Sequence, residues 1–238
     1  MTFNSVIQSF PWYNLFAGLA LIAGIYLYRF NARKIDDFPQ RKDFLIIIMG
    51  VAAVAGFALS NVAGWFFYSG LFELTLLDRI RAAGFTFYAG LLVFIAISWR
   101  WMVLFGFKTD LYFNEIVPSI TLFHAIARIG CILAGCCYGI KIDFQLLSFT
   151  ISRFPVREIE IIFLLIMTVL FQIKILKNRL IIYLAGYSLL RLILEFFRGD
   201  DRGYLVTGVL SPTQEMALAV LIFIMVISFP KLKSIAKK

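Results

Sequence analysis

Long apolar stretches constrain this chain more than any other feature of its sequence. Seven of them approach the roughly 20 apolar residues that a helix needs to cross the hydrocarbon core of a bilayer. They cover residues 12–28, 44–67, 85–106, 114–135, 159–176, 180–197 and 212–229. A segment in lipid must satisfy its own backbone hydrogen bonds, so these stretches predict helices. We therefore predict an all-α polytopic membrane protein, with residues 1–238 forming a single domain of seven transmembrane helices.

Composition supports a membrane protein over a soluble one. Hydrophobic residues make up 61% of the chain, charged residues only 16%, and the mean hydropathy is +0.88. A soluble domain of this size would expose far more charge. The net charge of +9 would suggest a nucleic-acid partner in a soluble protein, but in a membrane protein the basic residues between the spans set the orientation. We predict no nucleic-acid partner.

The loop charges predict that the N-terminus lies outside and the C-terminus inside. With that orientation, the cytoplasmic segments hold about twice as many Lys and Arg residues as the outer segments. Residues 1–10 contain no Lys or Arg, so they lack the basic leader of a signal peptide and we expect the first span to be retained. Residues 68–84 are partly amphipathic and are expected to lie on the outer membrane surface, and an outer loop is expected after Gly139. The basic residues of the outer segments favour an anionic ligand.

Residues 122–139, with the sequence LFHAIARIGCILAGCCYG, contain the only histidine, an arginine within a span and all three cysteines. On a helix, His124, Arg128 and Cys131 share one face. A central arginine in a membrane helix costs roughly 2.5–3.5 kcal/mol on translocon scales unless a partner or ligand offsets it. Arg128 is therefore a candidate functional residue, with a structural ion pair as the alternative.

The sixth span carries a second polar stripe. Tyr187, Arg191 and Glu195 recur at intervals of four, and Arg198 follows three residues later, which predicts that all four share one helical face. Arg191 and Glu195 can pair with each other, and in that case Arg128 would still lack a counter-ion. Two arginines and one central glutamate leave an excess positive charge that a phosphate would satisfy.

The three cysteines form a C-x4-C-C pattern that matches none of the common zinc spacings, so we predict neither a metal nor a cofactor. Three interpretations stay open. The cysteines can serve as small packing residues, or Cys131 can form a disulfide with Cys136 or Cys137. Alternatively, Cys136 or Cys137 is a nucleophile whose thiolate is favoured by Arg128 or His124.

Five segments resemble motifs of the prolipoprotein diacylglyceryl transferase family, and the segments from the third span onward occur in the same order as the family's motifs. ARIGCILAGCCYG resembles the family's G-R-x-G-N signature, FPVREIE resembles H-P-x-Q-x-Y-E, and YSLLRLILEFFRGDD resembles Y-x-x-x-R-x-x-x-E-F-x-R-x-P-D. GFTFYAG is similar to G-x-S-F-H-G-G, and WYNLF to a tyrosine motif of the first span. The resemblance selects Arg128, Arg191, Glu195 and Tyr88 as catalytic candidates and Tyr13, Gly139, Glu160, Tyr187 and Arg198 as candidates for substrate binding.

The resemblance implies a bacterial inner-membrane enzyme that binds phosphatidylglycerol between its helices. Such an enzyme moves the diacylglyceryl group to a cysteine thiol of a lipoprotein precursor, and glycerol phosphate leaves. Arg128 and Arg191 would then hold the phosphate from separate helices, and a base would take the thiol proton. Tyr88 stands where the family has a histidine, and because an unperturbed tyrosine is a poor base at neutral pH, His124 is the alternative base.

Two other functions fit the same residues. The first is a divergent phospholipid acyl or headgroup transferase that acts on a different acceptor through Cys136 or Cys137. The second is a non-enzymatic lipid transporter in which the arginines line a path for lipid. Labelled phosphatidylglycerol distinguishes them, because only an enzyme releases a labelled fragment.

Overall fold

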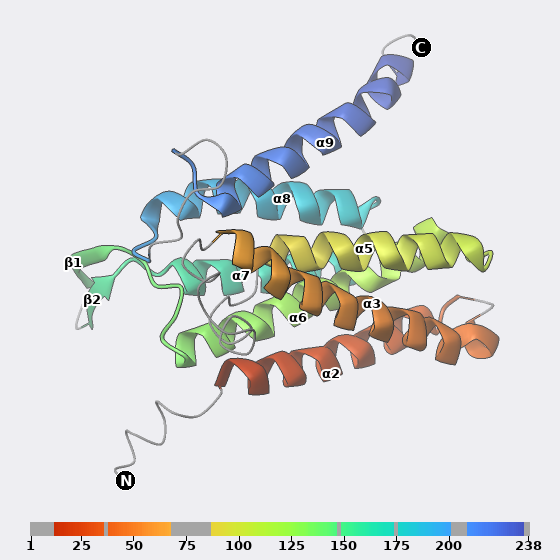
Figure 1. Cartoon of the computed structure of the whole chain (residues 1–238), viewed down its shortest axis with the longest axis horizontal. Coiled ribbons are helices and arrows are strands. Elements are labelled where there is room, and N and C mark those ends of the chain that lie inside the picture. Colours follow the sequence, from red (N-terminus) through yellow and green to blue (C-terminus); the bar gives the residue numbers. More distant parts are fainter. Residues whose placement is uncertain are drawn as a thin grey trace. The chain divides into compact units, whose positions relative to one another are not determined.

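The computed structural model describes residues 12–35, 38–67, 87–146, 149–173, 176–200 and 209–235, which are almost entirely helical (Figure 1). The predicted surface segment at residues 68–84 lies outside these residues. In chain order the helices are α2 (Trp12–Ala32), α3 (Phe38–Phe67), α5 (Phe87–Leu104), α6 (Thr109–Leu133), α7 (Val156–Gln172), α8 (Arg179–Leu194) and α9 (Pro212–Ile235). A hairpin of β1 (Lys141–Leu146) and β2 (Phe149–Arg153) separates α6 from α7, and a 3-10 turn, Glu195–Phe197, follows α8.

Each of the seven predicted spans corresponds to one of these helices. Among the residues that the structure describes, four stretches are long and apolar enough to cross a bilayer: Leu15–Ala32, Phe87–Leu104, Thr109–Leu133 and Arg179–Phe197. The apolar parts of α3 and α9, Phe44–Ser60 and Pro212–Ser228, are shorter. The prediction of a largely helical chain with apolar, membrane-length helices is therefore confirmed, whereas the number of spans and their orientation stay predictions.

The chain divides into two compact units. The first comprises Met1–Lys34, Phe113–Tyr183 and Phe196–Asp200, and so contains α2, most of α6, the hairpin and α7. The second comprises Ile35–Tyr112, Leu184–Glu195 and Asp201–Lys238, and so contains α3, α5, most of α8 and α9.

Close packing around α6 organises the first unit. A Cβ on Gly130 would lie 2.8 Å from Phe16 Cβ, and one on Gly24 would lie 3.4 Å from Ser119 O, so α2 and α6 approach closely where these glycines lie. On the α7 side, the hydroxyl groups of Thr121 and Thr168 are 2.8 Å apart and buried. Thr121 of α6 is thus placed inside protein, in contact with α7.

The segment after Gly139, which the sequence analysis expected to be an outer loop, contains a β-hairpin between α6 and α7. Its strands are antiparallel, with Lys141 opposite Arg153 and Leu146 opposite Phe149, and the register is irregular between Lys141 and Phe144. The apolar residues of β1 alternate with polar ones, which is the period of a strand. The segment therefore has a fixed structure next to the end of α6.

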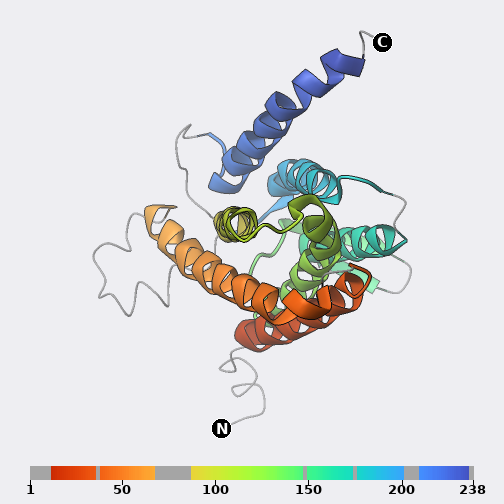
Figure 2. The same ribbon diagram turned by 90° about the vertical axis from the view of Figure 1, so that its right-hand side faces the viewer.

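In the second unit, α3 and α5 meet at two glycines. A Cβ on Gly56 would lie 2.6 Å from Gly90 O, and one on Gly90 would lie 3.0 Å from Gly56 O. Figures 1 and 2 show α3 in orange beside α5 in yellow. Small residues at the crossing bring the two backbones together, as is common where helices associate in membranes.

Candidate functional site in the membrane helices

A buried ion pair joins α6 to α7 in the first unit. Arg128 Nε lies 3.0 Å from Glu160 Oε2. Glu160 is fully buried and Arg128 is 9% exposed. The expectation that Arg128 lacks a counter-ion is therefore wrong, because α7 begins at Val156 and carries Glu160 inward on its second turn, against α6. Residue spacing within α6 held no information about this partner.

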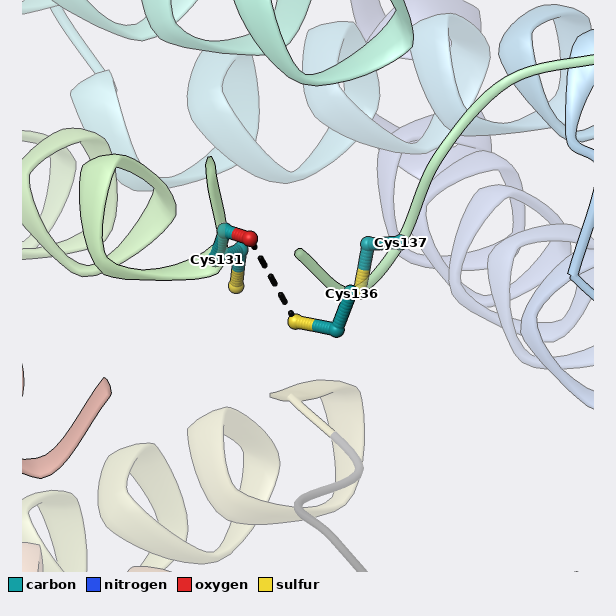
Figure 3. Close-up of side chains that lie close together, drawn as sticks. All are labelled: Cys131, Cys136 and Cys137. Atoms are coloured by element: carbon teal, nitrogen blue, oxygen red, sulfur yellow. Dashed lines mark hydrogen bonds between the residues drawn. The ribbon is translucent and has the colours of Figure 1, made fainter. Parts of the chain in front are cut away.

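The three cysteines gather at the end of α6 (Figure 3). Cys131 is buried in the last turn, Cys136 and Cys137 follow in the turn, and the three sulfur atoms lie within 4.8 Å of one another. Gly135 and Cys137 have φ values of +68° and +60°, so the chain reverses within a few residues. Arg157 Nη1 donates to the carbonyl oxygens of Cys131 at 3.4 Å and Cys136 at 3.1 Å, which fixes this turn against the start of α7.

The thiol of Cys136 is not activated in this arrangement. Its hydrogen bond with Cys131 lowers the pKa, but the hydrogen bond with Cys137 and the partial loss of hydration around this surface thiol outweigh that effect, so the pKa is raised overall. The three cysteines form no disulfide with one another in the structure. A nucleophilic role for Cys136 therefore needs another group to stabilise its thiolate.

Tyr13 and His124 lie on the helices around Arg128. Tyr13 is near the start of α2 beside Gly130, and it lies close enough to Cys131 and Arg128 to interact with them electrostatically. His124 is one turn before Arg128 on α6, is 2% exposed, and has Nδ1 3.1 Å from the hydroxyl oxygen of Tyr183. Tyr183 was not a predicted site residue, since an aromatic residue in an apolar span gives no signal of its own.

Gly139 occupies a junction of three backbone segments. A Cβ there would collide with Phe154 O, and a Cβ on Gly199 would lie 2.7 Å from Gly139 O. Hydrogen bonds join the same segments: Ile140 N donates to Phe197 O at 2.9 Å and Gly199 N to Tyr138 O at 3.0 Å. Gly139 is thus required by packing, in addition to any contact that it makes with substrate.

The prediction that Arg198 shares the helical face of Tyr187, Arg191 and Glu195 is wrong. Helix α8 ends at Leu194 and the chain then forms a 3-10 turn, so the helical period does not extend to Arg198. Arg198 instead forms a two-bond ion pair with Asp200, with Nε–Oδ1 and Nη2–Oδ2 distances of 2.9 and 2.6 Å. It also forms a backbone bridge with Gly139.

The second unit holds its own buried ion pair. Arg191 Nη2 lies 2.6 Å from Glu195 Oε2, and Arg191 is 1% exposed. Ser211, just before α9, donates its hydroxyl to Glu195 Oε1 at 2.9 Å. This pairing is the alternative that the sequence left open. Ser211 was not predicted as a partner of Glu195, because it lies 16 residues later in the sequence, just before α9.

Tyr88 and Tyr187 lie together in the second unit. Their ring centroids are 5.6 Å apart, and the Tyr88 hydroxyl donates to Ser188 Oγ at 3.3 Å. Both tyrosines are buried, with exposed fractions of 2% and 1%. Tyr88 is thus held by α8.

The charge balance at Arg128 and Arg191 differs from the sequence-based expectation. Each of the two predicted phosphate-binding arginines has a carboxylate partner in its own unit, so the expected excess of one positive charge is wrong. A carboxylate can hold a guanidinium in a fixed orientation. An anionic ligand at either arginine must then share that guanidinium with the carboxylate.

Comparisons with known proteins point to a single family. A sequence profile described as prolipoprotein diacylglyceryl transferase matches residues 2–229. A Clostridium tetani protein named phosphatidylglycerol–prolipoprotein diacylglyceryl transferase is 35% identical over 121 residues, which cover 45% of this chain and 48% of that protein. A Clostridium perfringens protein of the same name, numbered 2, is 33% identical over 121 residues, covering 45% and 46%. A Dehalococcoides mccartyi protein of that name is 24% identical over 209 residues, covering 80% and 78%. The match spans about half the length of the two clostridial relatives.

Proposed function

Because the chain belongs to the prolipoprotein diacylglyceryl transferase family, we propose that it transfers the diacylglyceryl group of phosphatidylglycerol to a cysteine thiol of a lipoprotein precursor. Glycerol phosphate is the second product. The observation that carries this proposal is the buried Arg128–Glu160 pair, which holds a guanidinium inside the helices of a membrane protein. The relatives' names describe this reaction for those proteins.

The chemistry explains why a buried guanidinium is needed. The acceptor sulfur attacks the glycerol carbon that bears the phosphate, an S–C bond forms, and the C–O bond to phosphate breaks. The electron pair of that C–O bond stays on the phosphate oxygen, so negative charge grows on the leaving group. A guanidinium that hydrogen-bonds the phosphate oxygens stabilises this charge in a site of low dielectric constant. Arg128 has this role in the proposal.

Glu160 is the residue that positions Arg128. It is fully buried, and its Oε2 lies 3.0 Å from Arg128 Nε. This contact at Nε fixes the plane and direction of the guanidinium group, whose donors are suited to a phosphate. Glu160 thereby aligns the arginine before lipid binds, and the alignment reduces the entropy lost on binding.

The other candidate residues have supporting roles in the proposal. Arg191, held by Glu195, is the second cation for the phosphate group. His124 or Tyr88 takes the proton of the acceptor thiol. The remaining candidates position the lipid or acceptor: Tyr13, Gly139, Glu160, Tyr187 and Arg198.

The proposal includes the membrane arrangement. All seven helices cross a bacterial inner (plasma) membrane as one domain, residues 1–238, with the N-terminus outside and the C-terminus inside. The excess of basic residues on the predicted cytoplasmic side supports this orientation. The cysteine turn and the hairpin then lie at the outer face, where a lipoprotein precursor presents its cysteine.

The test uses phosphatidylglycerol labelled in its headgroup glycerol, with a membrane-anchored peptide containing one cysteine as acceptor. The wild-type chain is expected to release labelled glycerol phosphate and to add the diacylglyceryl mass to the peptide. Arg128→Gln should lose both activities, by about 10²–10³-fold if one charge-stabilising donor is removed. Arg100→Gln, which changes an exposed arginine at the end of α5, is the matched control and should behave as wild type.

Three results would contradict the proposal or redirect it. Lipid movement without release of any labelled fragment would favour a transporter. Release of a fatty acid, or of a headgroup fragment without modification of the peptide, would favour the divergent transferase. Equal turnover by Arg128→Gln and wild type would remove Arg128 from the site. Rescue of a strain depleted of its lipoprotein transferase would identify the natural acceptor class.

A further inference from the structure

The cysteine turn at the end of α6 has a geometry that its sequence spacing did not predict. The three sulfur atoms lie within 4.8 Å of one another. In a tetrahedral zinc site with Zn–S bonds of about 2.3 Å, the sulfurs are about 3.8 Å apart. The widest pair would need to approach by only about 1 Å, which side-chain rotation can supply.

The backbone explains why adjacent cysteines can face one centre. Neighbouring side chains in a regular strand point to opposite sides. Here Cys137 has φ +60°, a left-handed conformation that non-glycine residues rarely adopt, and Gly135 has φ +68°. The two left-handed residues turn the chain so that Cys136 and Cys137 approach Cys131 (Figure 3). The rarely occupied conformation at Cys137 is thus tied to the gathering of the sulfurs.

The surroundings suit a site with an open side. Cys131 is buried and Cys137 is half-buried, whereas Cys136 is exposed, so the cluster reaches the surface of the unit. Three protein ligands and one exchangeable position are the pattern of catalytic zinc sites, while structural sites use four protein ligands. Thiolates are preferred ligands for this ion.

Positive charge around the turn balances the charge of such a site. Zinc with three thiolates carries one excess negative charge, and a fourth thiolate adds another. Arg157 is fixed at the turn through the carbonyl oxygens of Cys131 and Cys136. Arg128 lies close enough to both cysteines to interact with them electrostatically. These guanidinium groups would oppose part of the negative charge that thiolates bring to the turn, whereas without a metal the pKa of the Cys136 thiol is raised.

We propose that Cys131, Cys136 and Cys137 bind one Zn²⁺ ion through three thiolates and that the open position of the ion takes the cysteine thiol of the acceptor. The inference deepens the proposed function and rests on it for the identity of the acceptor. Zinc binding releases the three cysteine protons to solvent. The acceptor thiol would release its own proton on binding to zinc, and His124, Tyr88 or solvent water would accept it without having to be a strong base. The bound sulfur keeps a lone pair for attack on the lipid carbon, and the thioether product leaves the ion as glycerol phosphate departs.

The experiment uses the full-length chain, purified without a polyhistidine tag and reduced, in phosphatidylcholine nanodiscs. Zinc per chain is measured by atomic emission, and Co²⁺ is titrated as a spectroscopic probe of thiolate ligation. The expected result is one metal ion per chain. Cys131→Ser/Cys136→Ser/Cys137→Ser removes every cysteine of the chain and should bind none. Cys136→Ala changes only an exposed side chain, so it should keep the fold while lowering affinity by more than about tenfold.

A single-cysteine peptide tests the open position. Added to the Co²⁺ form, it should increase the thiolate-to-cobalt absorption, and its serine counterpart should leave the spectrum unchanged. The inference is overturned if the reduced chain binds no metal, if the cysteine-free variant binds equally well, or if the peptide leaves the spectrum unchanged.

These readouts do not depend on turnover. If zinc removal leaves phosphatidylglycerol turnover unchanged, the zinc inference fails while the proposed function stands. If the ion and peptide bind but no acceptor yields glycerol phosphate, the metal site stands while the proposed function fails.

Discussion

Replacing Glu160 with glutamine tests the ion pair at the centre of the first unit. The substitution keeps the size of the side chain and removes its charge. Glu160 is fully buried and Arg128 is 9% exposed, so water cannot replace the lost carboxylate without opening the packing between α6 and α7. Arg128 would then be a buried cation facing an amide.

The expected cost is large for a change of one charge. Removing one partner of a buried ion pair destabilises a protein by about 3–5 kcal/mol. Each kcal/mol lowers the melting temperature of a chain of this size by about 2–4 °C, so Glu160→Gln should lower it by about 6–20 °C. Arg128→Met/Glu160→Leu removes both charges and should recover most of that loss, because an apolar pair of similar volume often matches a buried ion pair.

The assay is thermal unfolding in nanodiscs, followed by the fluorescence of the chain's four tryptophans. Glu158→Gln is the control: it lies on the same helix and its side chain is 41% exposed, so we expect a change within about 0.5 kcal/mol. If Glu160→Gln melts at the wild-type temperature, or if the double variant is less stable than the single one, then Glu160 does not hold Arg128 as described.

Three further predictions concern packing, hydrogen bonding and thiol reactivity. Gly139→Ala should lower the free energy of unfolding by at least about 1–3 kcal/mol, because the added Cβ would collide with backbone atoms. Gly18→Ala is the control: no atom lies within 4 Å of its added Cβ, so it should be neutral or stabilising by up to about 1 kcal/mol. Thermal unfolding of the two variants compares these effects. Ser211→Ala removes a hydrogen bond to the Glu195 carboxylate and should cost about 1.5–3 kcal/mol in the same assay, a value that an unchanged melting temperature would contradict. The raised pKa of Cys136 leaves less thiolate at pH 7. In metal-free protein, iodoacetamide should therefore alkylate Cys136 more slowly than it alkylates the cysteine of an unstructured peptide, and the rate for Cys136 should still rise above pH 8.5. Equal alkylation rates at pH 7 would refute this prediction.

Features that depend on one segment were predictable from the sequence. Hydropathy located a helix at each of the seven expected positions, because burial in lipid demands continuous apolar residues. The spacing of Arg191 and Glu195 identified a possible pair within α8, and the structure contains it. The cost of a buried cation singled out Arg128 without any knowledge of its neighbours.

Features that depend on contacts between segments were not predictable. Glu160 is far from Arg128 in sequence, so the pair becomes visible only once α7 packs against α6. The end of α8 at Leu194 moved Arg198 off the helical face, because a period can be extended only while the helix continues. The left-handed turn at Cys137 brought together sulfurs whose spacing matched no common zinc pattern.

The most direct test of the account measures the contact between Arg128 and the lipid phosphate. Solid-state NMR can detect dephasing between ¹⁵N in arginine side chains and ³¹P of phosphatidylglycerol bound in nanodiscs. A charge-assisted hydrogen bond of about 2.7–2.9 Å between guanidinium nitrogen and phosphate oxygen predicts a ¹⁵N–³¹P signal in wild type that decreases in Arg128→Lys. An identical signal in both proteins would show that the phosphate is held elsewhere and would contradict the central claim.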